Sequence, residues 1–244
     1  MAEKPLEGQV ALVTGGARRI GRSIALALAG AGARVAVHYN TSKGDAEATR
    51  REIEQRGGEA FLTQGDLSRV DEARRVAEAA LQHFGRVDLL INNAGIWEPH
   101  HWDKITEAVW DRFLDTNLKS QFFLAQALAP QMKQRGRGCI VNLASIGGLR
   151  AWSEFIPYCV SKAGVIMLTR ALAKALGPEI RVNAVAPGSV QFPGEAPDQN
   201  YIRRAPLQRT GTPDDIVQTV LFLCTSADFV TGQTIVVDGG FSLT

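Results

Sequence analysis

Tyr158 and Lys162 are the side chains in this sequence whose types and spacing best suit proton transfer. They lie four residues apart in the segment 155–176, whose apolar residues recur with helical periodicity, so both project from one face of a helix. A free tyrosine has a pKa near ~10 and is a poor acid at neutral pH. A fixed positive charge beside it favours the phenolate and lowers that pKa toward the working range. Most tyrosine–lysine pairs at this spacing have no catalytic role, so the assignment depends on the surrounding elements.

A glycine-rich turn near the N-terminus is typical of dinucleotide binding. An apolar run at 10–13 precedes the sequence Thr-Gly-Gly-Ala-Arg-Arg-Ile-Gly, and an alanine-rich helical pattern follows at 23–31. Between a strand and a helix, glycines allow a tight turn and let the backbone approach a pyrophosphate at the positive end of the helix. We expect Gly15 and Gly21 to fill these roles. The competing interpretation is an ordinary strand-to-helix turn with a glycine cap.

Composition restricts the class of protein. The 244 residues are 45% hydrophobic and 21% charged, which suits a full core under a polar surface. The formal net charge of +2, with both signs interspersed, provides no basic stripe for nucleic acid. Without a signal-peptide pattern or an apolar segment of membrane-spanning length, we expect a cytoplasmic protein with no membrane partner. Three well-separated cysteines suit a reducing compartment, and four histidines show no metal-ligand spacing, so no metal is expected.

Strand-like and helical segments alternate along the whole chain, which predicts a parallel sheet with helices on both faces. We therefore expect an α/β fold, a single doubly wound Rossmann-type domain over residues 1–244 with a seven-stranded parallel sheet. The predicted strands are 10–14, 34–38, 60–64, 88–92, 138–144, 181–186 and 234–237. The predicted helices are 20–31, 43–56, 70–84, 108–135, 155–176 and 214–224.

The region 187–213 interrupts this alternation. It holds five prolines and three glycines among scattered charges, with little periodicity. A connection of this length in a compact fold is usually functional, and it would follow the sixth strand at the sheet edge where ligands bind. We interpret residues 188–213 as a substrate lid, the alternative being an inert surface excursion.

Several motifs together resemble the short-chain dehydrogenase/reductase family over essentially the whole sequence. The glycine turn at 14–21, Gly-Asp-Leu at 65–67, Asn-Asn-Ala-Gly at 92–95 and Pro-Gly at 187–188 occur in the family's order and at its spacings. The resemblance identifies Asn117, Ser145, Tyr158 and Lys162 as the catalytic residues. It implies an oxidoreductase that uses a nicotinamide cofactor.

The family chemistry gives each of these positions an expected role. A carbonyl that accepts a hydride develops negative charge on oxygen, so Ser145 would hydrogen-bond that oxygen and Tyr158 would donate the proton. Lys162 would lower the phenol pKa and hold the nicotinamide ribose, and Asn117 would position a water that passes protons to the lysine. Taken alone, the serine and the asparagine are as well explained as a turn residue and a polar cap. The positions expected to bind the cofactor are Gly15, Arg18, Arg19, Ile20, Gly21, Tyr39, Asn40, Thr41, Ser42, Asp66, Leu67, Asn93, Ala94, Gly95, Tyr158, Lys162, Pro187, Gly188 and Val190.

The end of the second predicted strand indicates which nicotinamide cofactor is bound. Proteins of this architecture that prefer NAD usually place a carboxylate there for the ribose hydroxyls. This chain has His-Tyr-Asn-Thr-Ser at 38–42 and no carboxylate. Arg18 and Arg19 lie in the glycine turn, where a guanidinium can pair with a 2′-phosphate. We therefore expect NADP(H).

The chain departs from the family pattern in ways that leave its substrate open. Arg19 stands where most members carry the middle glycine of the turn, and in this it resembles pteridine reductases. That branch has an aspartate in place of Ser145 and a serine in place of Gly95, so the catalytic centre is that of the carbonyl-reducing majority. Ile-Trp-Glu at 96–98 differs from the Thr-Arg-Asp of typical 3-oxoacyl-carrier-protein reductases, and a nicotinamide-contacting threonine is lacking after Gly188, where backbone groups of Val190 would serve instead.

The sequence therefore predicts an NADPH-dependent reductase of a small-molecule carbonyl, either a ketone or a 3-oxoacyl compound. The alternatives are a pteridine (dihydropterin) reductase and, in another class, a catalytically inactive NADP-binding regulatory protein. The resemblance also implies a homotetramer. A set of aromatic residues near the predicted cleft would either stack on a flat ring or only pack the lid; they are Trp97, His100, His101, Trp102, Trp152, Phe155 and Phe192.

Overall fold

The computed structural model describes residues 4–244 and contains one seven-stranded sheet with the order β3-β2-β1-β4-β5-β6-β7. Every neighbouring pair of strands is parallel. The α/β, Rossmann-type fold predicted from the alternating pattern is therefore confirmed. The strands are β1 (Val10–Val13), β2 (Arg34–Tyr39), β3 (Ala60–Gln64), β4 (Leu89–Asn92), β5 (Gly138–Leu143), β6 (Ile180–Pro187) and β7 (Thr234–Val237).

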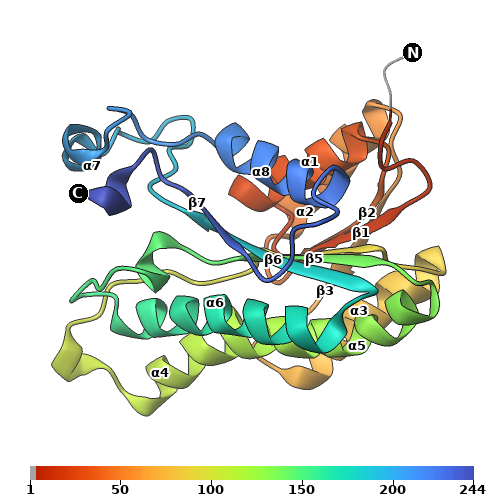
Figure 1. Ribbon diagram of the computed structural model, residues 1–244, viewed down its shortest axis with the longest axis horizontal. Helices are drawn as coiled ribbons and strands as arrows, with labels where there is room; N and C mark the ends of the chain where they lie inside the picture. Colours follow the sequence, from red (N-terminus) through yellow and green to blue (C-terminus); the bar gives the residue numbers. More distant parts are fainter. Residues whose placement is uncertain (1–3) are drawn as a thin grey trace.

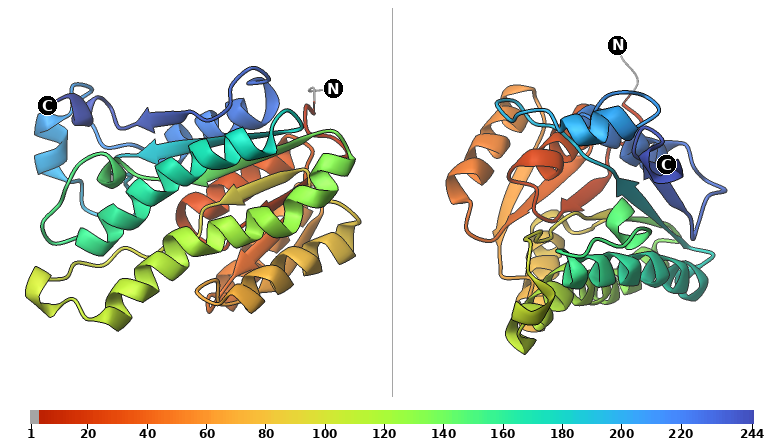
Figure 2. Two further views of the ribbon diagram at one scale, coloured as in Figure 1. Left: turned by 60° about the horizontal axis from the view of Figure 1, so that its bottom comes forward. Right: turned by 90° about the vertical axis from the view of Figure 1, so that its left-hand side faces the viewer.

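Helices cover both faces of the sheet (Figure 1). One face carries α1, α2 and α8, and the other carries α3, α5 and α6, with α5 and α6 side by side (Figure 2). None of the helices described within residues 4–244 is both long and apolar enough to cross a membrane. The helices are α1 (Arg19–Gly30), α2 (Lys43–Gln55), α3 (Val70–Phe84), α4 (Glu107–Leu114), α5 (Ser120–Gln134), α6 (Ile156–Leu176), α7 (Gln199–Arg204) and α8 (Pro213–Thr225).

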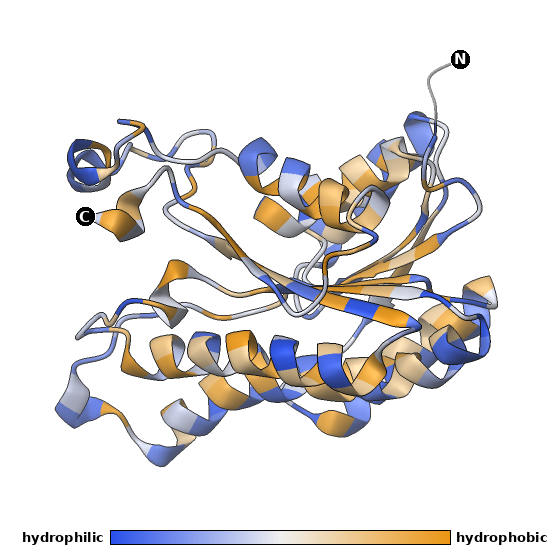
Figure 3. Ribbon diagram, in the orientation of Figure 1, coloured by the Kyte–Doolittle hydropathy of each residue, from blue (hydrophilic) through white to orange (hydrophobic). Residues whose placement is uncertain are grey.

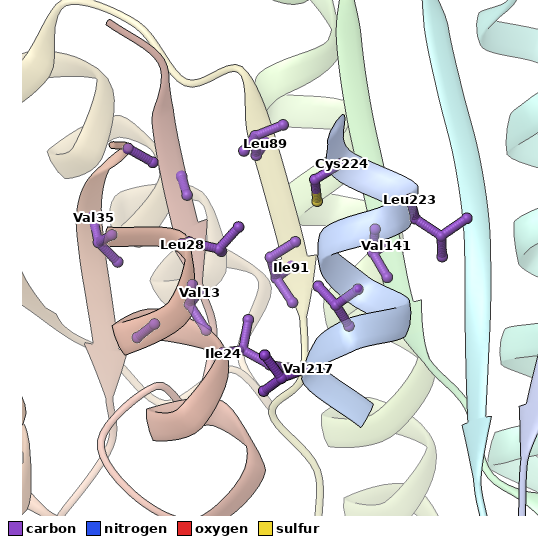
Figure 4. Packing of buried hydrophobic residues seen from close by; sticks show 14 of the residues in the cluster. Val13, Ile24, Leu28, Val35, Leu89, Ile91, Val141, Val217, Leu223 and Cys224 are labelled. Carbon is purple, nitrogen blue, oxygen red and sulfur yellow. The ribbon is translucent and has the colours of Figure 1, made fainter. Parts of the chain in front are cut away.

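The sheet is buried on both sides, as an all-parallel sheet with helical cover must be. All four residues of β1 and of β4 are buried, and the strands are mostly hydrophobic in Figure 3. On one face, Ile24 and Leu28 of α1 meet Val217 of α8 above the strands (Figure 4). Each such side chain contributes roughly 1.5–3 kcal/mol by leaving water. This core fixes the strand ends on which the site depends.

The predicted single helix at 108–135 is wrong in one respect. The structure has α4, then a π-helical turn at Asp115–Lys119, then α5. The π turn contains Asn117, which is fully buried, and its carbonyl accepts a hydrogen bond from the Gln121 side chain at 2.9 Å. π turns are rare and frequently mark functional positions. This one sets the direction in which the asparagine projects.

The strand order places the loops that follow β1 and β4 beside each other, at the carboxyl ends of the two central strands. The connections leave β1 and β4 toward opposite faces, because the order reverses between these neighbouring strands. In open α/β sheets the ligand crevice lies at such a reversal, outside the carboxyl ends of the strands. Thr14 and Asn93 follow β1 and β4 directly, so they lie at this crevice.

Candidate active site

A large cleft of about 1460 Å³ opens at the carboxyl ends of the strands. Every residue expected to bind the cofactor lines it, from the glycine turn through Val190. Of the four expected catalytic residues, Ser145, Tyr158 and Lys162 line the cleft as well. Asn117 does not; it is fully buried and hydrogen-bonds to Ile96, which lines the cleft.

The glycine turn is fastened to the loop after β4. The Thr14 hydroxyl accepts hydrogen bonds from the backbone N–H groups of Asn93 and Ala94, at 2.9 and 3.0 Å. The Asn93 amide donates in return to the carbonyls of Thr14 and Gly15, at 2.9 and 3.1 Å. The turn thereby keeps a fixed shape. The sequence did not indicate this supporting role of Thr14, although the residue begins the motif.

Two glycines are required by the shape of this turn. Gly15 has φ +60°, a left-handed conformation that side chains disfavour. A Cβ at Gly21 would lie 2.1 Å from the Gly15 carbonyl oxygen. At α1, which starts here, Arg18 provides no side-chain cap, and no acidic residue occupies the first turn. The first N–H groups of the helix are thus available to an anion, and the residues present fit a dinucleotide pyrophosphate.

His38 at the end of β2 supports the turn and was missed in the sequence. Its Nδ1 accepts the Gly15 N–H at 3.1 Å, and its Nε2 donates to the Gly65 carbonyl at 2.9 Å. Burial lowers the pKa of His38 to about 4, although the Gly65 hydrogen bond opposes the shift. The ring is therefore neutral at pH 7, as its acceptor role requires. Because the two partners are distant in the sequence, only the chemistry of the residue type could have suggested this role.

Arg19 adopts an unusual backbone conformation for an arginine. Its φ is +54°, in the left-handed region, at the position where the sequence suggested a replaced glycine. The guanidinium lies 3.9 Å from the centre of the Phe192 ring and donates to Glu195 at 2.6 Å. The side chain thus points at the segment after β6. This partner makes Arg19 a contact of the predicted lid, so Arg18 becomes the better candidate for a 2′-phosphate.

The residues after β2 form the side of the cleft suited to a nucleotide ribose. Tyr39 is buried against Ala17 and Ala46, whereas Asn40 and Thr41 are exposed. The Asn40 carbonyl accepts a hydrogen bond from Gln64, which orders the loop. No carboxylate occurs at 38–42, so nothing in this loop would repel a 2′-phosphate.

The groups expected to react lie where β5 ends and α6 begins. Ser145 follows β5, and its hydroxyl accepts the Gly147 N–H at 3.0 Å. Burial raises the pKa of Tyr158 to about 12, while a hydrogen bond with Ser145 offsets part of the rise. We expected Lys162 to lower this pKa, but the structure shows burial dominating and holding the phenol protonated. A protonated phenol beside a serine can donate to a carbonyl oxygen.

Lys162 is held behind the tyrosine. Its ammonium lies 5.8 Å from the centre of the Tyr158 ring and donates to the Leu143 carbonyl at 2.6 Å. Burial lowers the pKa of Lys162 to about 8. Its charge is therefore retained at neutral pH and lost in mild alkali.

Asn117 positions the turn beside this lysine. Its Oδ1 accepts the Ile96 N–H at 2.8 Å, and its Nδ2 donates to the Ile96 carbonyl and to Ser161. Both amide N–H groups are thus used within the protein. A Cβ at Gly95 would lie 3.2 Å from Asn117 Oδ1, so the glycine permits this approach.

The region 188–213 closes one side of the cleft. It contains the short helix α7, where the Asp198 side chain accepts the Tyr201 N–H at 3.0 Å. The Tyr201 hydroxyl donates to the Asp238 carbonyl at 2.5 Å, and Val190 pairs with Gly211 in an isolated bridge. Neither α7 nor this anchoring tyrosine was predicted. Asp198, a residue type that often caps the start of a helix, was the available sequence signal for α7.

Comparison with known proteins agrees with this geometry. The family model described as enoyl-(acyl carrier protein) reductase matches residues 15–242. A 3-oxoacyl-(acyl-carrier-protein) reductase, FabG, of Staphylococcus epidermidis is 43% identical over 238 residues, covering 94% of this chain and 97% of the relative.

Solved structures with the same fold include dehydrogenases. A 7α-hydroxysteroid dehydrogenase complexed with NADH and 7-oxo glycochenodeoxycholic acid has a TM-score of 0.92 and 34% identity, covering 98% of this chain and 96% of that chain. A short-chain dehydrogenase/reductase from Serratia marcescens has a TM-score of 0.92 and 33% identity, covering 98% of this chain and 99% of that chain. The chain therefore belongs to the short-chain dehydrogenase/reductase family. It is an oxidoreductase that acts on C=O and CH–OH groups, which confirms the class predicted from Tyr158 and Lys162.

Proposed function

We propose that the protein is an NADPH-dependent ketoreductase in which Tyr158 donates the proton and Ser145 stabilises the developing oxyanion. The observation that carries the proposal is the half-buried phenol of Tyr158, which lies beside Ser145 in the dinucleotide cleft with the Lys162 ammonium 5.8 Å from its ring centre. When bound, the nicotinamide supplies the hydride. Ser145 and the phenol then supply the hydrogen bonds and the proton that the oxygen requires.

The choice of NADPH rests on the loop after β2. Asn40, Thr41 and Ser42 line the cleft, and Arg18 is exposed across from them. A guanidinium and several neutral donors suit a phosphate, whereas NAD-binding members use a carboxylate there. One solved structure with this fold holds NADH, so the fold alone does not determine the cofactor. The proposed preference for NADPH therefore depends on these residues of the chain.

Substituting Asn40→Asp tests this preference. Asn40 is exposed, whereas an aspartate at the buried Tyr39 would also disturb packing. The added carboxylate repels a 2′-phosphate, so we expect the ratio of kcat/KM for NADPH over NADH to fall at least about tenfold. An unchanged ratio would mean that the phosphate is recognised elsewhere.

The reaction itself is tested by NADPH oxidation with purified protein. We expect turnover with a ketone or a 3-oxoacyl thioester and none with a dihydropterin. The pterin alternative rests on the resemblance at Arg19, and dihydropterin reduction alone would establish it. Turnover of any carbonyl would exclude the inactive, regulatory alternative.

We also propose a homotetramer in the cytoplasm. Exposed apolar side chains on α5 and α6, including Phe122, Val160 and Met167, provide a surface that a second copy could cover. Light scattering of the purified protein tests the assembly, and a monomeric mass would contradict it.

A further inference from the structure

Four aromatic side chains form a continuous row along the substrate end of the cleft. Trp97 stacks on Phe155 with ring centres 4.8 Å apart and planes 5° apart. Phe155 meets Trp152 edge-on at 6.0 Å, and Trp152 lies nearly parallel to Tyr158 at 6.3 Å. All four residues line the cleft. This aromatic row (Trp97, Phe155, Trp152 and Tyr158) therefore leads from the cleft mouth to the proton donor.

The backbone makes room for the inner end of the aromatic row. A Cβ at Gly147 would lie 2.8 Å from the Trp152 ring and 3.0 Å from the Tyr158 ring. Any side chain at that position would displace one of the two rings. The parallel arrangement next to the reacting phenol thus depends on a glycine two residues after Ser145.

The outer end of the aromatic row presents apolar surface that the protein does not cover. Trp97 remains 61% exposed although it stacks on Phe155. Large apolar surface facing a cleft beside convergent polar groups is typical of ligand binding. Trp102 is similarly exposed, at 69%, but does not line the cleft. It provides an internal comparison.

The charges at this end favour an uncharged ligand. Arg112, which lines the cleft beside Trp97, is paired with Glu98, and Arg19 is paired with Glu195. Glu154 and Asp198 add negative charge to the lining. Among the described lining residues, the remaining cations are Arg18 on the nucleotide side and Lys162 behind the phenol. Among these lining residues, no unpaired cation is left at the substrate end for a carboxylate or a phosphate.

From these contacts we propose that the substrate is a free, uncharged ketone whose carbonyl is carried by a flat aromatic ring system. The inference rests on the proposed ketoreductase function and names its substrate class. The ring lies against the aromatic row while the carbonyl oxygen reaches Ser145 and Tyr158. Stacking on such a wall is worth about threefold to tenfold in affinity beyond simple burial.

Two ketones with the same carbon skeleton test the proposal. In 2-tetralone and 2-decalone the carbonyl is not conjugated to a ring, so its reactivity is similar, but only the first is aromatic. We expect kcat/KM with NADPH to be about tenfold higher for 2-tetralone. Trp97→Leu should lower that value about fivefold, mostly through KM, and change the value for 2-decalone less than about twofold. Trp102→Leu is the matched control and should change neither.

Each other outcome is decisive. Equal kcat/KM for the two ketones, or an equal effect of Trp97→Leu on both, would overturn the substrate class. A higher kcat/KM for acetoacetyl-CoA than for 2-tetralone would also overturn it while leaving the ketoreductase function intact. Reduction of none of these carbonyls would instead remove the proposed function.

Discussion

The guanidinium of Arg19, the first residue of α1, donates to the carboxylate of Glu195 at 2.6 Å across the cleft. The same carboxylate accepts the Phe192 N–H at 3.3 Å, and the guanidinium covers the Phe192 ring. The cofactor turn and the segment after β6 are thus joined by one charged side chain. Arg19 also has a φ of +54°, a strained backbone conformation for a residue other than glycine.

Substituting Glu195→Gln tests whether this contact holds the lid closed. The amide keeps a hydrogen-bond acceptor but loses the charge, and Arg19 and Glu195 are both partly exposed, so the effect is modest. We expect kcat/KM for the carbonyl substrate to fall about twofold to fivefold, with little change in thermal stability. Glu59→Gln, at an exposed position before β3, is the matched control. A loss equal in both variants would contradict a lid contact.

Removing the phenol tests the proton donor. Tyr158→Phe keeps the ring and its packing against Trp152 but cannot donate a proton. Turnover should fall by on the order of 10²–10⁴-fold, whereas the Kd for NADPH, measured by fluorescence titration, should change little. Substantial residual turnover with intact cofactor binding would assign the proton to another group.

The buried lysine predicts an alkaline limit to activity. Burial lowers the pKa of Lys162 to about 8, so in the free enzyme its charge is present below that pH and lost above it. We expect kcat/KM for ketone reduction to decline as the pH rises through about 8. Lys162→Arg should turn over more slowly yet lose this decline, because a guanidinium stays charged to about pH 12. A decline that persists unchanged in the arginine variant would point to a different group.

His38 predicts a loss of stability in acid. Its pKa is about 4 in the folded protein against an ordinary 6.5, so the unfolded chain binds the proton more tightly. The contribution of neutral His38 to the free energy of unfolding is therefore complete above about pH 6.5. It falls, by up to roughly 3 kcal/mol, as the pH drops toward 4.

The His38→Gln variant isolates this contribution. The amide can accept from the Gly15 N–H without titrating, so urea unfolding should show a shallower loss between about pH 6.5 and pH 4. All other groups titrate alike in both proteins. Identical pH dependence in the two would mean that His38 is not protonated on unfolding in this range.

The sequence predicted the sheet well because strand and helix patterns are local. All seven strands lie within one residue of their predicted bounds, and Tyr158 and Lys162 share a face of α6 as their spacing required. The π turn at Asn117 was not predictable from periodicity, because an apolar pattern does not mark where i→i+4 hydrogen bonding changes to i→i+5 for a single turn. Its carbonyl is satisfied by Gln121, a side chain with no motif of its own.

Contacts between segments that are distant in the chain could not be predicted from the sequence either. Arg19 and Glu195 are 176 residues apart, and neither residue type nor spacing links them. Gly15 and His38 meet only because β1 and β2 are neighbours in the sheet. The sequence thus identified which residues face the cleft, whereas their partners followed from topology.

The hydrogen bond from Gly15 to His38 limits how freely parts of this fold can be exchanged. A redesign that replaced β2 and its following loop to alter cofactor preference would also remove the acceptor of a buried peptide group in the preceding turn. Leaving that N–H unpaired costs about 1–3 kcal/mol. A replacement segment therefore has to bring a neutral acceptor at position 38, so the turn and the second strand have to be redesigned together.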